Sequence, residues 1–242
     1  MFFANIEESE EQMRIDSGDL LNSILESLDR IEYIQPEDIP SIDLYMDQVT
    51  TFMDKRLKSS ARYPGEDKIL TKTMINNYAK NELLPSPIKK KYSKEHILLL
   101  IFIYYYKGVL SITDIQTLLG PITEQYFQNG KKFNLESVYK EVFSMEKEQV
   151  EILKADVIER YKRSQETFEN APSKDKDFLQ KFAFICMLSF DVYVKKLIIE
   201  KMIDELNTKA GSREKTEKVQ KEQKAEKTVK QDKAEKSTKN TK

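Results

Sequence analysis

The residues best suited to specific chemistry are short amides, hydroxyls and lysines that gather between residues 71 and 91. They are Thr71, Lys72, Thr73, Asn76, Asn77 and Lys80, followed by Lys89, Lys90 and Lys91. An asparagine amide can pair with an adenine edge through two hydrogen bonds, and Lys and Thr side chains reach phosphates or base edges. This combination predicts a surface that contacts double-stranded DNA.

The distribution of charge along the chain supports the same interpretation. The net charge is only −1, but residues 1–53 carry 13 acidic residues against two arginines, and residues 54–94 carry eleven basic residues against four acidic ones. A basic block inside an otherwise acidic chain is typical of a polyanion-binding surface. Arg62 lies within this block, and we include it among the expected DNA contacts.

Apolar spacing predicts the elements that hold these residues. Residues 71–81 predict a short helix that Thr71 caps. Its inner side is formed by Met74, Ile75 and Tyr78. Pro85 and Pro87 prevent a helix in the segment that follows, so the three lysines after them belong to an extended or hairpin excursion.

The chain around this segment is predicted to be helical. One helix begins at the N-cap Ser41 and precedes the short helix. An apolar helix capped by Ser93 follows it, forms the centre of the core and ends at Gly108. A further helix starts at Ser111 and stops at residues 120–121, a Gly-Pro pair.

The C-terminal part predicts a hairpin of two long helices, residues 135–169 and 177–206. In the tail after it, Lys recurs at every third position from Lys215 to Lys242. This period makes no constant helix face, so we expect the tail to be disordered. Two roles remain open for it, a solubilising tail and a non-specific DNA-tethering arm.

The single cysteine and single histidine restrict the chemistry. Cys186 lies in an apolar run and is expected to be a buried, inert thiol, and His96 is expected to be a partly exposed surface residue. With so few ligands, and without a glycine-rich phosphate loop or nucleophile motif, we expect neither an enzyme nor a bound metal or cofactor. We see no signal peptide, and the longest uncharged apolar run, residues 97–106, is half of a bilayer span, so we expect a cytoplasmic protein without membrane contact.

The segment Leu70 to Pro85 resembles the recognition helix and wing start of MerR-type bacterial regulators, whose pattern is V-S-x-x-T-[IL]-R-x-Y-E-x-x-G-L-L-x. Residues 90–93 match their R-x-Y-[ST], and residues 108–119 resemble G-x-S-x-x-E-I-x-x-L-L with one extra residue. Together with residues 42–49, the block is more narrowly similar to the bacterial family catalogued as domain of unknown function 1836, itself thought to be MerR-like. The resemblance implies a winged helix-turn-helix and, from the C-terminal helix of MerR-type proteins, a homodimer.

Three departures from the MerR pattern affect this expectation. Asn76 replaces an Arg that makes a phosphate or base contact, and Glu82 replaces the Gly after the recognition helix. We expect Asn81 to supply the left-handed cap instead. An insertion over residues 54–68 carries Lys55, Arg56, Lys58 and Arg62, which could replace lost phosphate contacts.

The predicted fold is therefore mainly α, with a MerR-like winged helix-turn-helix followed by a long helical hairpin. The predicted regions are a flexible acidic terminus (1–17), a short helix and linker (18–40), the winged-helix domain (41–120), a helical region for dimerisation or ligand binding (134–206) and the disordered Lys-rich tail (207–242). The predicted function is that of a transcriptional regulator with an unidentified effector. The alternative is a protein-interaction module that keeps the scaffold without binding DNA.

Overall fold

The computed structural model of the chain describes residues 19–29, 33–63 and 68–239, without the side chains of residues 60, 146–147 and 209–239. The predicted flexible terminus, residues 1–17, lies outside the described residues. The chain divides into two units, Met1–Lys196 and Leu197–Lys242, and the second consists of the continuation of one helix.

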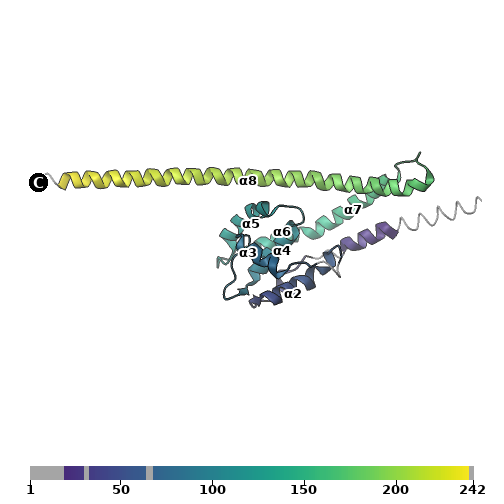
Figure 1. Ribbon diagram of the computed structural model, residues 1–242, viewed down its shortest axis with the longest axis horizontal. Helices are drawn as coiled ribbons and strands as arrows, with labels where there is room; N and C mark the ends of the chain where they lie inside the picture. The colour runs from purple at the N-terminus through teal and green to yellow at the C-terminus, as the bar shows by residue number, and fades with distance from the viewer. Residues whose placement is uncertain (1–18, 30–32, 64–67, 240–242) are drawn as a thin grey trace, which may run out of the picture. The chain divides into compact units, whose positions relative to one another are not determined.

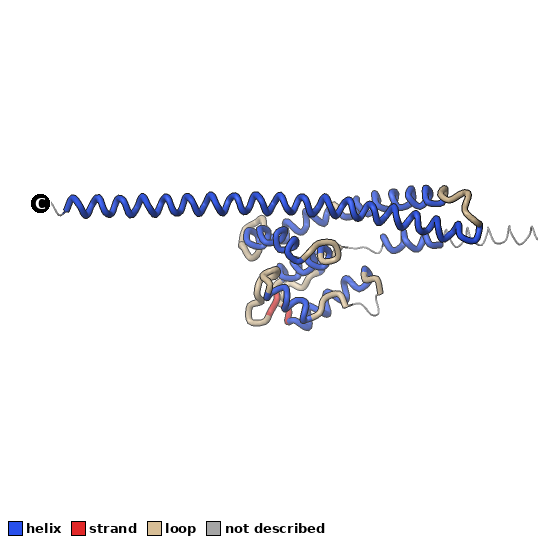
Figure 2. Tube along the Cα trace, turned by 45° about the horizontal axis from the view of Figure 1, so that its top comes forward, coloured by secondary structure: helices blue, strands red, loops and turns tan. Residues whose placement is uncertain are grey.

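The fold is mainly helical with one small sheet, as the sequence predicts (Figures 1 and 2). A helix over residues 19–29 comes first. The elements after it are η1 (Pro36–Asp38), β1 (Leu44–Tyr45), α2 (Met46–Leu57), η2 (Lys58–Ser60), α3 (Lys72–Lys80), β2 (Lys91–Tyr92), α4 (Lys94–Tyr106), α5 (Ile112–Tyr126), α6 (Leu135–Ser144), α7 (Glu146–Gln165) and α8 (Ser173–Lys239).

The centre of the core is α4, whose residues from His96 to Ile103 are all buried. A helix that is apolar on every side must be surrounded, and α4 lies among the other helices of this lobe in Figure 1. Ser93 is its N-cap, and the helix ends before Gly108 as predicted. Among the described residues, no helix has the length and apolar composition needed to cross a bilayer.

An aromatic cluster joins the segment before β1 to α4 and α6. The rings of Tyr33 and Phe143 stack 5.3 Å apart, and Phe102 and Tyr139 meet edge to face at 5.4 Å. The Tyr139 hydroxyl donates a hydrogen bond of 2.8 Å to the buried carbonyl oxygen of Ile34. The segment predicted as a linker is thus partly core, because Ile34, Pro36 and Ile39 are all buried.

Three predicted helix boundaries were wrong. Tyr45, not Ser41, is the N-cap of the helix before α3, because residues 44–45 form β1. The helix from Ser111 continues through Pro121 to Tyr126, since its apolar stripe, Ile115, Leu119, Ile122 and Tyr126, runs past the proline. The long helix predicted from residue 135 is two helices, α6 and α7, which are separated at Met145.

The helices α7 and α8 form the predicted hairpin (Figure 2). The amide of Gln180 donates to the carbonyl oxygens of Gln165 and Thr167, at 2.6 and 3.2 Å. Further along, the Tyr161 and Phe184 rings meet edge to face. Cys186 is exposed, which corrects the prediction of a buried thiol, because it lies on the side of α8 opposite these contacts.

The backbone of α8 continues through the Lys-rich tail to Lys239. The described side chains end at Thr208, so the disorder expected for residues 207–242 stays a prediction.

Candidate nucleic-acid interface

The polar side of α3 faces solvent. Ile75 and Tyr78 are buried, and five of the predicted contact residues are exposed, namely Lys72, Thr73, Asn76, Asn77 and Lys80. Thr71 is half-buried at the start of the helix. Exposure satisfies the first requirement for a helix that is to enter a groove of DNA, and the contacts themselves stay a prediction.

The start of α3 is fixed by three hydrogen bonds. The Thr71 hydroxyl accepts the backbone N–H of Met74 at 3.2 Å, so this residue caps the helix as predicted. The carbonyl oxygen of Ile69 accepts a hydrogen bond of 2.7 Å from the Lys107 ammonium, and the Ile69 N–H donates to Asp54 at 3.4 Å. Burial lowers the pKa of Lys107. These contacts hold α3 against α2 and α4.

The end of α3 is a Schellman motif centred on Glu82. Glu82 has a φ of +58° and takes the left-handed conformation itself, whereas Asn81 has a φ of −94°. The N–H of Leu83 donates to Tyr78 at 2.9 Å, and the N–H of Glu82 donates to Ala79 at 3.2 Å. The expectation that Asn81 would supply the left-handed cap was therefore wrong. In addition, the Gln116 amide of α5 donates to the Asn81 carbonyl oxygen.

The lysine turn, residues Ile88–Lys91, is the second exposed basic feature. Lys89 and Lys90 have φ values of +51° and +64°, and the N–H of Lys91 donates to Ile88 at 2.9 Å. Two central residues with positive φ define a type I′ hairpin turn, for which Asn and Gly are the favoured residues. Lysine in this conformation is strained by roughly 1–2 kcal/mol per residue. The predicted hairpin excursion is confirmed, and two strained lysines form its tip.

The start of α3 and the lysine turn both contact residues 45–47, where β1 ends and α2 begins. Tyr45 pairs with Lys91 in the antiparallel sheet, and the Lys91 ammonium lies 5.1 Å from the centre of the Tyr45 ring. Two residues further along, Asp47 forms an ion pair with Lys72. Residues 45–47 therefore bring the two basic features together.

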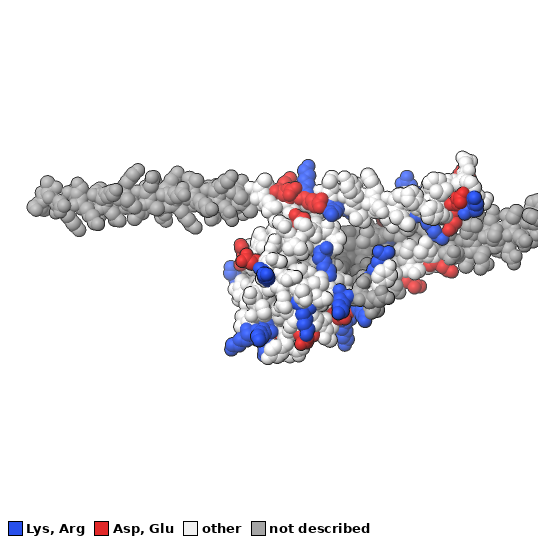
Figure 3. Space-filling model, in the orientation of Figure 1, with Lys and Arg blue, Asp and Glu red and all other residues white. Residues whose placement is uncertain are grey.

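The lysines near this junction differ in how far their charge is compensated. Lys72 is paired with Asp47, whereas no ion pair of the described residues involves Lys80, Lys89 or Lys90. Between residues 68 and 94 the sequence has seven lysines and one acidic residue, Glu82. On the face that Figure 3 shows, basic side chains stand in separate groups over the lobe of α2 to α6.

Arg62 lies apart from these elements, on the segment after η2. Its guanidinium is 5.3 Å from the centre of the Tyr63 ring and the side chain is exposed. The segment continues into residues 64–67, which lie outside the described residues. The inclusion of Arg62 in the interface stays a prediction.

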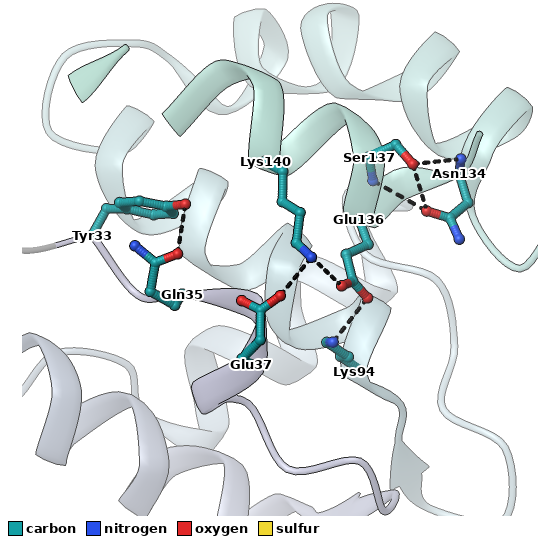
Figure 4. Close-up of polar contacts among 8 residues, drawn as sticks. All are labelled: Tyr33, Gln35, Glu37, Lys94, Asn134, Glu136, Ser137 and Lys140. Atoms are coloured by element: carbon teal, nitrogen blue, oxygen red, sulfur yellow. Dashed lines mark hydrogen bonds and ion pairs between the residues drawn. The ribbon is translucent and has the colours of Figure 1, made fainter. Parts of the chain in front are cut away.

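An ion network joins η1, α4 and α6 (Figure 4). The Glu136 carboxylate accepts from Lys94 at 2.8 Å and from Lys140 at 3.2 Å, and Lys140 also pairs with Glu37 at 2.5 Å. Burial tends to raise the pKa of Glu136, but the hydrogen bonds from the two lysines outweigh it and lower that pKa. No local pattern in the sequence predicts this network, because its members are far apart in the chain.

His96 is buried, with 1% of its surface exposed, which corrects the expectation of a surface residue. The ring lies between Tyr92 and Phe127, at centroid distances of 5.5 and 4.9 Å. Its Nδ1 accepts the backbone N–H of Ser93 and completes a capping box. The sequence contains one indication of this cap: His96 stands at the third position of the helix, where Glu or Gln usually completes a capping box.

The described residues contain no group of three or more His, Cys, Asp or Glu side chains that could hold a metal ion. The groups that α3 and the lysine turn present to solvent are amides and lysines, which can recognise a ligand by hydrogen bonds and charge.

Comparison with known proteins identifies one family. Residues 34–142 match the model of a family described as a domain of unknown function, DUF1836, which confirms the resemblance to that family for this segment. The match begins at the buried Ile34 and ends in α6, so it includes the whole ion network and, of the aromatic cluster, Phe102 and Tyr139. No curated protein and no solved structure matches the chain.

Proposed function

We propose that the protein is a cytoplasmic, sequence-specific regulator that binds double-stranded DNA through a winged helix-turn-helix. In this proposal α2 and α3 are the helix-turn-helix, α3 lies in the major groove, and the lysine turn is the wing against the flanking backbone. The observation that carries the proposal is the exposed side of α3, rich in amides and lysines, beside a turn that holds two lysines in a strained conformation. Strain of this kind is often retained for function.

The proposed roles follow from the side chains. Asn76 and Asn77 contact base edges, because an amide can both donate to and accept from adenine. Lys80, Lys89 and Lys90 contact phosphates, since their charges have no acidic partner among the described residues. Thr71 caps α3 and so fixes its start, and its hydroxyl group can donate a hydrogen bond to a phosphate.

The proposed oligomer is a homodimer. Two copies would place two α3 helices on half-sites about one helical turn apart, so the operator would be an inverted repeat. Dimerisation doubles the number of contacts without requiring a larger domain.

Selection of bound fragments from the source genome, at near-physiological salt, tests the proposal. We expect enrichment of a short inverted repeat by the native protein and a loss of that enrichment with Asn77→Ala. A charge control is Lys131→Gln with Lys132→Gln, an exposed lysine pair outside the proposed interface. Recovery of fragments without a common sequence, or equal losses with the control, would reject the proposal.

A second candidate function is that of a protein-interaction module. It is favoured by the ion pair between Lys72 and Asp47, which neutralises one lysine of α3, and by the separate grouping of basic side chains in Figure 3. In that case purified protein would not retain any duplex at near-physiological salt.

A further inference from the structure

The outer side of α2 carries a hollow that the proposed DNA contacts do not use. Its volume is about 370 Å³, which is within the range of sites for small molecules. The segment before β1 and successive turns of α2 enclose it. The residues that line it are Pro40, Leu44, Asp47, Gln48, Thr51, Phe52 and Lys55.

The surface inside this α2 hollow is almost entirely apolar. Its apolar residues are Pro40, Leu44 and Phe52; Leu44 is buried, and the other two are half-buried. The polar residues that line the hollow are exposed and stand at its rim. Apolar walls with a few polar groups that orient the ligand are typical of a site for a small organic molecule.

Most polar groups of the rim already have partners within the protein. The Thr51 hydroxyl donates to the carbonyl oxygen of Asp47 at 2.8 Å, and Oε1 of Gln48 accepts a backbone N–H at 2.8 Å. The Asp47 carboxylate pairs with Lys72. No ion pair of the described residues involves Lys55. The groups left for a ligand are therefore donors, the Lys55 ammonium and the Gln48 NH₂ group, and they select a ligand with an anionic acceptor.

The charges of the rim determine how such an anion is oriented. Asp47 and Lys55 stand eight positions apart on α2, which is about 12 Å along a helix axis. A carboxylate is attracted by Lys55 and repelled by Asp47. The anionic end of the ligand therefore lies at Lys55, and its apolar end points towards Asp47.

We propose that the α2 hollow binds a small apolar monocarboxylate, with its alkyl or aryl group on Pro40, Leu44 and Phe52 and its carboxylate on Lys55. The same site gives the regulator an effector. The apolar end of the ligand excludes water from the ion pair of Asp47 with Lys72, and an ion pair is stronger where water is excluded. The ligand thus holds Lys72 away from DNA. The effector role rests on the proposed function, whereas binding of the carboxylate does not.

Titration with octanoate in the absence of DNA, followed by the NMR signals of the Leu44 methyl groups, tests the site. These methyl groups line the hollow and so report binding there and not at other apolar surfaces. We expect saturable shifts with a Kd on the order of 0.1–1 mM. Octanol keeps the chain without the charge, and acetate keeps the charge without the chain. Each should bind at least about tenfold more weakly than octanoate.

Substitutions at the rim test the orientation and the place. Lys55→Gln should raise the Kd of octanoate about tenfold, because it removes the charge that the carboxylate contacts. Lys58→Gln, at an exposed lysine outside the hollow, should leave the Kd unchanged. Thr51→Tyr fills the hollow from an exposed position and should abolish the shifts without disturbing the core. Absence of saturable shifts, as when a protein segment is the occupant, or an unchanged Kd in Lys55→Gln, would overturn the site.

The effect on DNA is measured separately. Saturating octanoate should lower the affinity of the protein for a duplex about fivefold, and Lys72→Gln should abolish this effect while the Kd of octanoate stays the same. Octanoate that binds but leaves the duplex affinity unchanged would overturn the effector role. If the protein bound no duplex even without octanoate, the proposed function would fail, and the Leu44 signals would still decide whether the site exists.

Discussion

The imidazole Nδ1 of His96 lies 3.0 Å from the backbone nitrogen of Ser93 and 2.8 Å from its hydroxyl oxygen. These two contacts between Ser93 and His96 cap the first turn of α4, which directly follows β2. Because β2 begins at the end of the lysine turn, the conformation at the base of the turn depends on this cap. Where glutamine would provide the same cap permanently, an imidazole provides it only while Nδ1 is unprotonated.

We therefore expect the stability of the native protein to fall as the pH drops below about 6.5. Burial lowers the pKa of His96 from its ordinary 6.5, opposed by backbone contacts at Pro85 and Ser86 and by the charge of Asp43. The unfolded chain takes up the proton first, so the contribution of His96 to stability is fully present above about pH 6.5 and is lost progressively below it. His96→Gln keeps the cap and cannot titrate. Urea unfolding between pH 7.5 and 5.5 should show the loss in the native protein but not in the variant, and equal losses would contradict the role of His96.

Replacing Lys89 by Asn and Lys90 by Gly should stabilise the protein and weaken DNA binding. Asn-Gly is the preferred type I′ pair, so relief of the positive-φ strain should raise the free energy of unfolding by about 1 kcal/mol or more. Loss of two phosphate contacts should lower DNA affinity by on the order of tenfold. Lys89→Ala with Lys90→Ala removes the charges but not the strain. If the Asn-Gly variant binds DNA as tightly as the native protein, the lysines are structural.

Glu82→Gly should stabilise the protein, as the Asn-Gly turn should, but it should strengthen DNA binding and not weaken it. Glycine adopts the left-handed conformation without a Cβ penalty, which is worth about 1 kcal/mol at this helix end. Removal of the only acidic residue between residues 68 and 94 should also tighten binding to any duplex. Glu82→Ala separates the two effects, because it should tighten binding without the gain in stability. Thermal unfolding of both variants measures the change in stability, and titration with DNA measures the change in affinity.

Glu136→Gln should cost about 1 kcal/mol of stability at pH 7, since the carboxylate accepts hydrogen bonds from both Lys94 and Lys140. The pKa of Glu136 is lowered in the folded protein, so its contribution is present above about pH 4.5 and disappears as the pH falls further. The difference between native and variant should thus shrink between pH 7 and 3.5. Glu141→Gln, at an exposed position on the same helix, is the matched control. A pH-independent difference would indicate a packing defect.

Local sequence patterns predicted the elements whose contacts are local. Thr71 caps α3 through a residue three positions away, and the prolines before the lysine turn exclude a helix whatever surrounds them. The mainly helical fold and the exposed side of α3 followed from such patterns.

The sequence could not predict features that depend on distant contacts. The burial of His96 depends on Phe127, thirty-one positions away, and the segment at Ile34 is core because Tyr139 reaches back to it. Pro121 stays within α5 because the apolar stripe continues past it, although a proline alone predicts a helix end. The exposure of Cys186 could not be predicted, because the residues around it are apolar on both sides of the helix and do not indicate which side is buried.

The salt dependence of binding to a duplex is the most direct test of the central claim, that α3 and the lysine turn form one phosphate-contacting surface. The native protein should show a linear fall of log affinity with log salt, and Lys80→Gln combined with Lys89→Gln and Lys90→Gln should make the slope shallower by about 2.7, or about 0.9 for each lost phosphate contact. Lys131→Gln with Lys132→Gln should leave the slope as it is. An unchanged slope in the triple variant would contradict the claim.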